Sequence, residues 1–164
     1  MVRVAGNCLG QTTEASLEYA IHNLNVKVVL VLGHEGCGAI QAARLPLSQI
    51  NKEPEALASV LRDLKSGLED SSRHIEHILD ARARDREAVA TNVKNQIVRL
   101  AEDPHTMERV DQGKMKLVGG FYEISSGIVD FFMLVAKEVP GEEFKPSPGV
   151  HSRYNPRTKE IVYA

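Results

Sequence analysis

The spacing of hydrophobic and polar positions along this chain predicts alternating helices and strands. Residues 2–4 have the pattern of the end of a strand, and a helix is predicted soon after them, with Thr12 or Thr13 as its N-cap and an inner face of Leu17, Ala20, Ile21 and Leu24. Residues 26–32 then form a nearly continuous, β-branched apolar run. Such a run is typical of a strand covered on both faces by helices in a parallel sheet, so this order predicts a βαβ unit.

The second half of the chain predicts helices followed by a hairpin. Residues 46–86 are polar and helix-prone, which indicates an insertion of two or three helices. A regular helix is predicted over 85–101, ending before Asp103-Pro104, with an inner face of Val89, Val93, Gln96 or Ile97, and Leu100. Residues 115–124 and 128–135 read as antiparallel strands joined by a turn at 125–127. The tail over 140–164 reads as a surface extension in which residues 161–163 could add an edge strand.

These elements predict one α/β domain over residues 1–164, with a mostly parallel sheet flanked by helices and a C-terminal antiparallel hairpin. A hydrophobic fraction of 43% and a charged fraction of 26% are typical of a globular protein. A net charge of -2 gives no general attraction to nucleic acid or anionic membranes, and neither partner is expected. The apolar run at 26–32 covers only about a third of a bilayer crossing.

The N-terminus has no basic segment followed by an apolar one, so no signal peptide is predicted. We therefore expect a cytoplasmic protein, with a periplasmic or organellar location as the alternative if further residues precede Met1. A chain of this size does not need a disulfide, so Cys8 and Cys37 are expected to be free thiols or metal ligands.

The candidate chemistry lies in the Gly-His-Glu-Gly-Cys-Gly segment that ends the predicted strand. His34 and Cys37, three positions apart, can direct an imidazole nitrogen and a thiolate at one cation, and this mixed pair suits Zn²⁺. The glycines permit a tight turn and leave backbone N–H groups for an anion beside the metal, such as hydroxide or bicarbonate. The alternative for the same residues is a simple strand-end turn with a buried thiol.

The other candidate residues give weaker evidence for a functional site. His74 and His77 share a helix face and could bind a metal, but a solvated surface is the stronger interpretation. Residues 82–86 hold three arginines that could contact anions, although the neighbouring acidic residues favour an ordinary exposed face. Tyr122 and Glu123 fall on the hairpin, where the aromatic ring is expected to pack. Gly33 to Gly38 lacks the Gly-Lys-Ser/Thr ending of a phosphate-binding loop.

Three ordered blocks of sequence carry a family resemblance. Val-Arg-Val-Ala-Gly-Asn at 2–7, Ser-Leu-Glu-Tyr-Ala at 16–20, and Val-Leu-Val-Leu-Gly-His-Glu-Gly-Cys-Gly-Ala at 29–39 resemble consecutive blocks of the β-class carbonic anhydrases. Asn92-Val93 with Gln96 and Leu100, and the hairpin at 117–127, resemble later parts of the same fold. The similarity covers roughly residues 1–135. It implies that His34 and Cys37 are two zinc ligands, that the substrate pair is CO2 and bicarbonate, and that the protein is a homo-oligomer, a dimer or a multiple of dimers.

The sequence also departs from that family. Members carry, upstream of the Ala-Gly-Asn block, a central strand that ends in Cys-x-Asp-x-Arg and supplies a third zinc ligand and an acid–base dyad. This chain begins after that point, so a truncated copy or fragment is expected, without the central first strand and with weakened metal binding. Cys8 is a candidate substitute ligand, and its alternative role is that of a small buried hydrophobe.

The resemblance therefore implies a zinc lyase that hydrates CO2, impaired in the chain as it stands. Two other hypotheses remain open. The first is a non-catalytic subunit that keeps the fold and the dimer surface. The second is a hydrolase of a CO2-like molecule such as carbonyl sulfide, which would be distinguished by the width of the pocket.

Overall fold

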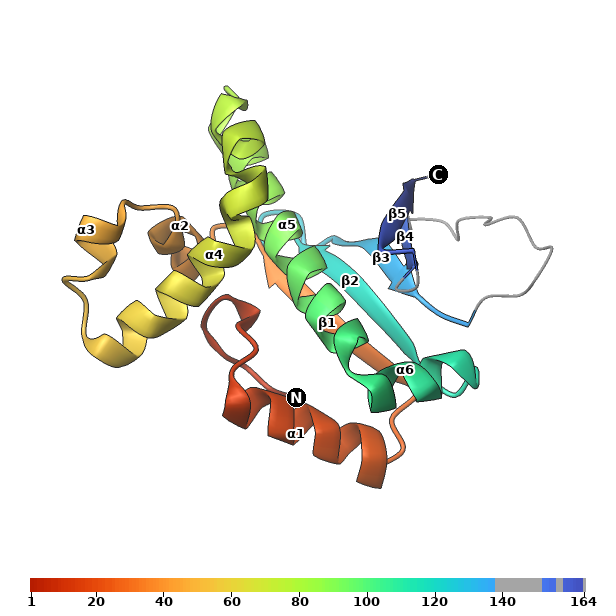
Figure 1. Cartoon of the computed structure of the whole chain (residues 1–164). Helices are drawn as coiled ribbons and strands as arrows, with labels where there is room; N and C mark the ends of the chain where they lie inside the picture. Colours follow the sequence, from red (N-terminus) through yellow and green to blue (C-terminus); the bar gives the residue numbers. More distant parts are fainter. Residues whose placement is uncertain (138–151, 156–157, 164) are drawn as a thin grey trace.

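The computed structural model describes residues 1–137, 152–155 and 158–163, and the helices and strands of this part of the chain are shown in Figure 1. A short 3-10 helix, η1 (Ala5–Asn7), precedes the α-helices α1 (Gln11–Asn23), α2 (Gly38–Ala43), α3 (Leu47–Ile50), α4 (Glu55–His77), α5 (Ala81–Glu102) and α6 (Pro104–Asp111). The strands are β1 (Val28–His34), β2 (Lys116–Tyr122), β3 (Val129–Val135), β4 (Ser152–Asn155) and β5 (Glu160–Tyr163).

The five described strands form one sheet in the order β1-β2-β3-β4-β5. The pairs β1–β2 and β3–β4 are parallel, whereas β2–β3 and β4–β5 are antiparallel. The sheet is therefore mixed rather than mostly parallel, because two of its four described strand pairs are antiparallel. The predicted hairpin and the predicted edge strand at 161–163 are both confirmed.

Helix α5 lies across one face of β1 and β2 and forms the centre of the core (Figure 1). The residues predicted for its inner face, Val89, Val93, Gln96, Ile97 and Leu100, are all buried. Gly33 on β1 permits this close packing, because a Cβ atom there would lie 2.5 Å from the Val89 side chain. The helical period of the sequence thus located the face of α5 that meets the sheet.

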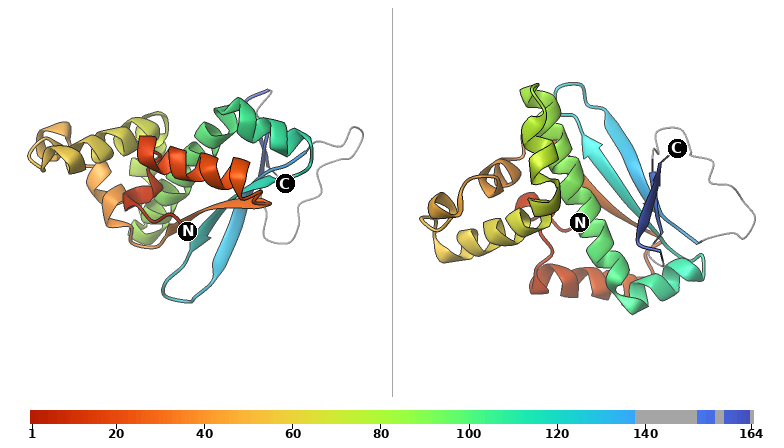
Figure 2. Two further views of the ribbon diagram at one scale, coloured as in Figure 1. Left: turned by 90° about the horizontal axis from the view of Figure 1, so that it is seen from below. Right: turned by 45° about the horizontal axis from the view of Figure 1, so that its top comes forward.

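The opposite face of β1 is open. Val28 is 54% exposed, Leu30 is 43% exposed and Phe131 on β3 is 38% exposed. The helices lie on one side of β1 to β3 in the view from below, which corrects the expectation that residues 26–32 are covered on both faces (Figure 2). A continuous apolar run predicts a strand, but it does not show whether a helix of the same chain covers each face.

Helices α3 and α4 occupy most of the region 46–86, as the polar helical pattern predicted (Figure 1). The buried residues of α4 recur at helical spacing and pack against α2 and α5; they are Ala58, Leu61, Leu64, Leu68 and Ile75. His74 and His77 are exposed, in agreement with the surface interpretation. Helix α5 begins at Ala81 rather than at 85, because the Asp80 side chain accepts a hydrogen bond from the Ala83 N–H at 2.7 Å and caps the helix there.

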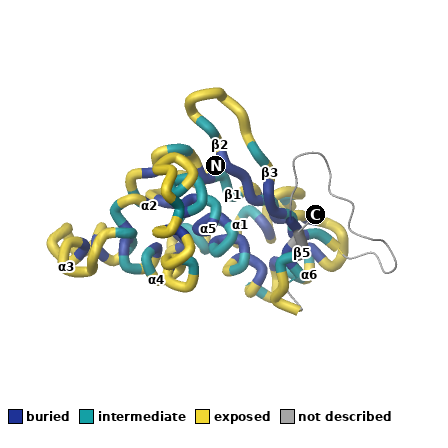
Figure 3. Tube along the Cα trace, turned by 90° about the horizontal axis from the view of Figure 1, so that it is seen from above, coloured by how far each residue is buried: buried dark blue, intermediate teal, exposed yellow. Residues whose placement is uncertain are grey.

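The N-terminal segment differs from the prediction in two details. Residues 2–4 form no strand, and the N-cap of α1 is Gly10, with no side-chain cap, so Thr12 and Thr13 lie inside the first turn. Ile21 is buried in the core, but Leu24 lies just past the end of α1 and is exposed. The alternation of buried and exposed segments along the chain is visible in Figure 3.

Much of the predicted tail, including Pro140, Gly141 and Gly149, lies outside the described residues. Among the helices that are described, none combines the length and the apolar character needed to cross a bilayer.

Candidate metal centre

The candidate site is the loop between β1 and α2. Strand β1 ends at His34, Gly36 adopts a φ of +68°, and Cys37 is the N-cap residue of α2. A positive φ at position 36 favours glycine, so the chain can turn within three residues from a strand into a helix. The loop therefore places His34 and Cys37 at the same end of β1, as the sequence predicted.

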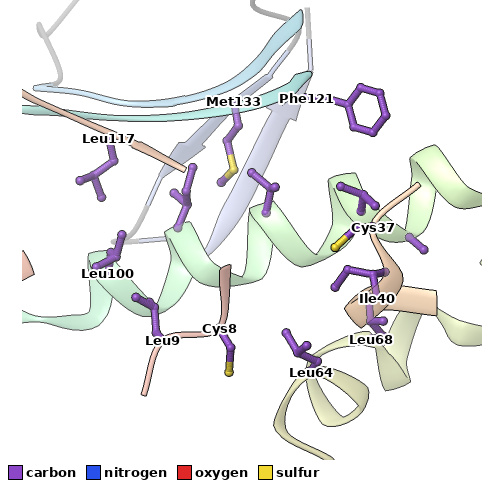
Figure 4. Packing of buried hydrophobic residues seen from close by; sticks show 14 of the residues in the cluster. Cys8, Leu9, Cys37, Ile40, Leu64, Leu68, Leu100, Leu117, Phe121 and Met133 are labelled. Atoms are coloured by element: carbon purple, nitrogen blue, oxygen red, sulfur yellow. The ribbon is translucent and has the colours of Figure 1, made fainter. Parts of the chain in front are cut away.

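His34 and Cys37 border one small cavity of about 40 Å³, lined also by Val4, Gly6, Asn7, Gly33, Ile40, Val89 and Asn92. This volume exceeds the roughly 10–15 Å³ that a water molecule requires. Cys37 is only 6% exposed, and Figure 4 shows it beside Ile40, near the α5 ribbon. The site is thus a narrow, partly apolar space with two potential metal donors in its wall.

His34 is exposed, and its hydrogen bond bears on which ring nitrogen could bind a metal. Its Nδ1 atom lies 2.9 Å from the carbonyl oxygen of Glu35. A carbonyl only accepts, so this hydrogen bond requires a proton on Nδ1, and in the neutral ring the lone pair is then on Nε2. The imidazole is therefore held in the tautomer that can coordinate a cation through Nε2.

The two donors fit zinc in kind, because imidazole nitrogen and thiolate are both common zinc ligands. Within residues 1–137, 152–155 and 158–163, however, no group of three His, Cys, Asp or Glu side chains is placed to hold one ion. Protein zinc sites ordinarily use three or four protein ligands. The described residues thus supply an incomplete set.

Cys8 does not join His34 and Cys37. In Figure 4 its side chain lies beside Leu9 and points away from the labelled Cys37. It is buried, and both burial and the negative charge of Asp63 raise the pKa of its thiol, while Arg99 opposes them. Both cysteines are free, and Cys8 has the environment of a packed thiol rather than of a ligand.

Buried amides of α5 hold the segment 6–9, of which Gly6 and Asn7 line the cavity. The Asn92 side-chain amide donates to the Gly6 carbonyl at 2.7 Å, and the Gln96 amide donates to the Asn92 oxygen at 3.1 Å. The Leu9 N–H in turn donates to Gln96 Oε1 at 3.1 Å. These bonds satisfy polar groups that would be costly to bury alone, and they fix the segment that faces His34 and Cys37.

Two carboxylates hold the loop itself. The Gly36 N–H donates to Asp85 Oδ2 at 2.9 Å, and the Gln41 side-chain amide donates to Asp85 Oδ1 at 3.0 Å. Glu35 accepts from the Ser125 N–H at 2.9 Å and from Arg82 at 2.8 Å. The backbone hydrogen bond from Ser125, and then the one from Arg82, lower the pKa of the Glu35 carboxyl.

These contacts were not predicted, because the charge pattern of residues 82–86 favoured an ordinary exposed face. In the structure Arg82 pairs with Glu35, Asp85 holds Gly36, and Arg86 pairs with Asp130. The partners lie more than 40 positions away, so local spacing carries no signal for them. The Gly36 N–H, which was expected to face a bound anion, is already engaged by Asp85.

The prediction that the Tyr122 ring packs is wrong. Tyr122 is at the end of β2 on the face away from α5 and is 36% exposed. Its backbone carbonyl still serves the site, since it accepts the Glu35 N–H at 2.9 Å and so continues the β1–β2 pairing into the loop.

Comparison with known proteins identifies the family to which this fold belongs. Residues 1–129 match the family model described as carbonic anhydrase. The chain belongs to the β-class carbonic anhydrase family. It is 27% identical over 137 residues to the carbonic anhydrase of Saccharomyces cerevisiae and 31% identical over 139 residues to carbonic anhydrase 2 of Mycobacterium tuberculosis.

These alignments cover 79% and 77% of this chain, respectively, and 59% of each relative. The fold resembles that of a tetrameric β-carbonic anhydrase from Sordaria macrospora, with a TM-score of 0.67 and 24% identity, over 76% of this chain and 61% of that one. The chain thus spans about three fifths of the length of these β-carbonic anhydrases.

Proposed function

We propose that this chain is the larger part of a zinc-dependent carbonic anhydrase that interconverts CO2 and bicarbonate. One observation carries the proposal: in a chain of this family, His34 and Cys37 border the same small cavity at the end of β1. Both sit at the positions at which the resemblance implies zinc ligands.

His34 through Nε2 and Cys37 as a thiolate would hold the metal. When bound, zinc supplies Lewis acidity that makes water a nucleophile near neutral pH. The Glu35 carbonyl keeps the His34 ring in its donor tautomer. Val4, Ile40 and Val89 give the cavity apolar walls suited to CO2, and the burial of Cys37 limits the access of bulk water to the thiolate.

A third ligand is required for full activity, and we propose that it comes from a Cys-x-Asp-x-Arg segment, as the family resemblance implies. Strand β1 pairs with β2 and is the first strand of the described sheet, so its other edge can accept a further strand. That strand would run beside His34. Without it, we expect this chain to bind zinc weakly and to hydrate CO2 slowly, because losing one ligand weakens a site by orders of magnitude.

The same incompleteness favours a second candidate, a non-catalytic subunit. The described residues provide two donors for one ion, and the fold and its open sheet face are present. Such a subunit would assemble with itself or with a catalytic copy but would not turn over CO2.

Stopped-flow measurement of CO2 hydration separates the two candidates. The zinc-loaded chain would be compared with its His34→Ala variant, with and without a version of the chain to which a Cys-x-Asp-x-Arg strand has been added before residue 1. We expect low turnover that rises with the added strand and disappears in His34→Ala. No turnover in any form would support the non-catalytic subunit.

A rate near 10³ per second from the 164-residue chain alone would contradict the proposed impairment. That rate lies at the top of the range usual for enzymes, and it would require a further ligand within these residues.

A homo-oligomer is also proposed. The Sordaria macrospora relative is described as tetrameric. In this chain the open sheet face carries exposed apolar residues on β1 and β3, namely Val28, Leu30, Val129 and Phe131. A second copy covering this face would remove them from water, which is the usual reason for such a patch on a folded protein.

A further inference from the structure

The loop that carries His34 and Cys37 is anchored to the first turns of α5. Asp85 uses both carboxylate oxygens: Oδ2 accepts the Gly36 N–H at 2.9 Å, and Oδ1 accepts the Gln41 side-chain amide at 3.0 Å. Gly36 directly precedes Cys37, and Gln41 lies one helical turn after it on α2. One carboxylate therefore holds the chain on both sides of the cysteine.

This arrangement restrains the part of the loop at Gly36. Gly36 has a positive φ and no side-chain atoms near its Cβ position, so its own packing does not fix the turn. The loop's own carboxylate, Glu35, accepts hydrogen bonds from Arg82 and Ser125. It therefore ties the loop to the β2–β3 turn rather than to α2. Among the described residues, Asp85 links the Gly36 amide to α2 through its two hydrogen bonds.

We propose that Asp85 is a positioning residue for the metal loop. By joining Gly36 to Gln41 it holds Cys37 in the orientation that shares a cavity with His34, before any metal binds. The part of the inference that concerns metal rests on the proposed function, whereas the part that concerns the loop does not. Hydrogen-bonding partners that orient metal ligands typically change metal affinity by about 10 to 100-fold.

The loop can be tested without metal through the reactivity of Cys37. In a Cys8→Ser background Cys37 is the single thiol of the chain, and it is 6% exposed. A buried thiol reacts with an aromatic disulfide reagent only when the loop opens. Asp85→Asn keeps the size of the side chain but turns an amide NH₂ toward one of the two donors. We expect the reaction to become about tenfold faster or more, in proportion to the opening of the loop.

Glu87→Gln is the matched control, because it removes the same charge from the same helix, and Glu87 accepts a hydrogen bond from Thr91 of α5 rather than from the loop. Its thiol reactivity should stay within about twofold of the Cys8→Ser parent. Equal rates for Asp85→Asn and Glu87→Gln would overturn the proposal. If Asp85→Asn does not fold, Gln41→Met removes one of the two hydrogen bonds and should raise the rate by a smaller factor; an unchanged rate would again overturn it.

Zinc affinity, measured by competition with a coloured chelator, gives the second readout. We expect Asp85→Asn to weaken zinc binding about tenfold, with Glu87→Gln unchanged and the thermal midpoint of both variants close to that of the parent. If the parent binds no zinc at all, the proposed function fails, while the thiol measurement still decides the role of Asp85. Weaker zinc binding with unchanged thiol reactivity would contradict positioning of the loop.

Discussion

Gly33 of β1 and Val89 of α5 approach so closely that a Cβ atom at position 33 would lie 2.5 Å from Val89 Cγ1. The same atom would lie 2.9 Å from Val93 Cγ2, so two successive turns of α5 both contact the strand closely. This contact sets the distance between the helix that carries Asp85 and the strand that carries His34.

A methyl group at position 33 should therefore destabilise the fold. We expect Gly33→Ala to lower the free energy of unfolding by about 1–3 kcal/mol, the usual cost of overpacking a core. Urea denaturation checks the value. Gly38→Ala is the matched control, because nothing lies within 4 Å of its Cβ position, and it should change stability by less than about 0.5 kcal/mol. Val89→Ala should restore part of the loss in the Gly33→Ala protein, and a failure to do so would place the strain elsewhere.

The start of α6 should depend on pH. Asp103 is the N-cap of this helix and accepts the Thr106 N–H at 2.7 Å. Burial raises the pKa of the Asp103 carboxyl, but hydrogen bonds from Thr106 and His105 outweigh burial and lower the pKa below 3.8. A lowered pKa stabilises the folded state fully above the unfolded value near 3.8, and this contribution is lost as the pH falls through the folded value.

We therefore expect Asp103→Ala to cost about 1 kcal/mol at pH 7, as for other N-caps, and less as the pH falls below 4. Asp103→Asn keeps a capping oxygen without the charge, so its cost at pH 7 should be smaller than that of Asp103→Ala, and it should shrink in the same way below pH 4, because the titrating carboxyl belongs to the parent. Unfolding curves at several pH values provide the measurement. A cost for Asp103→Ala that stays constant down to pH 3 would contradict this account.

Zinc should be held weakly, through His34 and Cys37. Two donors from the described residues leave the ion without a full protein ligand set. We expect less than one zinc per chain after dialysis against a mild chelator, and none in His34→Ala or Cys37→Ser. Elemental analysis decides the matter. One tightly retained zinc per chain would show that a further ligand exists, and Cys8→Ser would then be the next variant to examine.

The open sheet face should mediate self-association. Leu30→Asp places a charge at the centre of the exposed apolar residues of β1, and burial of an unpaired charge would disfavour a second copy there. We expect analytical ultracentrifugation to show a smaller species for Leu30→Asp than for the parent chain. Leu79→Asp is the control: Leu79 is 96% exposed between α4 and α5, away from the sheet, and its substitution should leave the assembly intact. Identical sedimentation of all three proteins would exclude this face.

Much of the fold could be predicted from local patterns in the sequence. The inner face of α5 follows from the spacing of Val89, Val93 and Ile97, and the β2–β3 hairpin follows from two apolar runs around Ser125-Ser126-Gly127. Both patterns depend on neighbours within a few positions. The approximate place of His34 and Cys37 was predictable for the same reason, because a strand and the turn that ends it are local features.

Long-range contacts were not predictable in this way. The bond from Gly36 to Asp85 spans 49 positions, and neither residue differs in type from an ordinary loop glycine or surface acid. The exposure of Leu30 depends on which element covers the second face of the sheet, and a single strand carries no information about that. Thr12 does not cap α1, because the helix already begins at Gln11.

The position of β1 at the end of the described sheet has a consequence for the handling of this chain in solution. Residues 28–34 are a seven-residue edge strand without Lys, Arg, Asp, Glu or Pro, the residues with which natural proteins discourage unwanted pairing. Such a segment has the composition of an amyloid-prone sequence. An isolated preparation is therefore expected to precipitate as it is concentrated or warmed, and Lys27 and Glu35, directly before and after the strand, are the nearest charges in the sequence that oppose fibril growth.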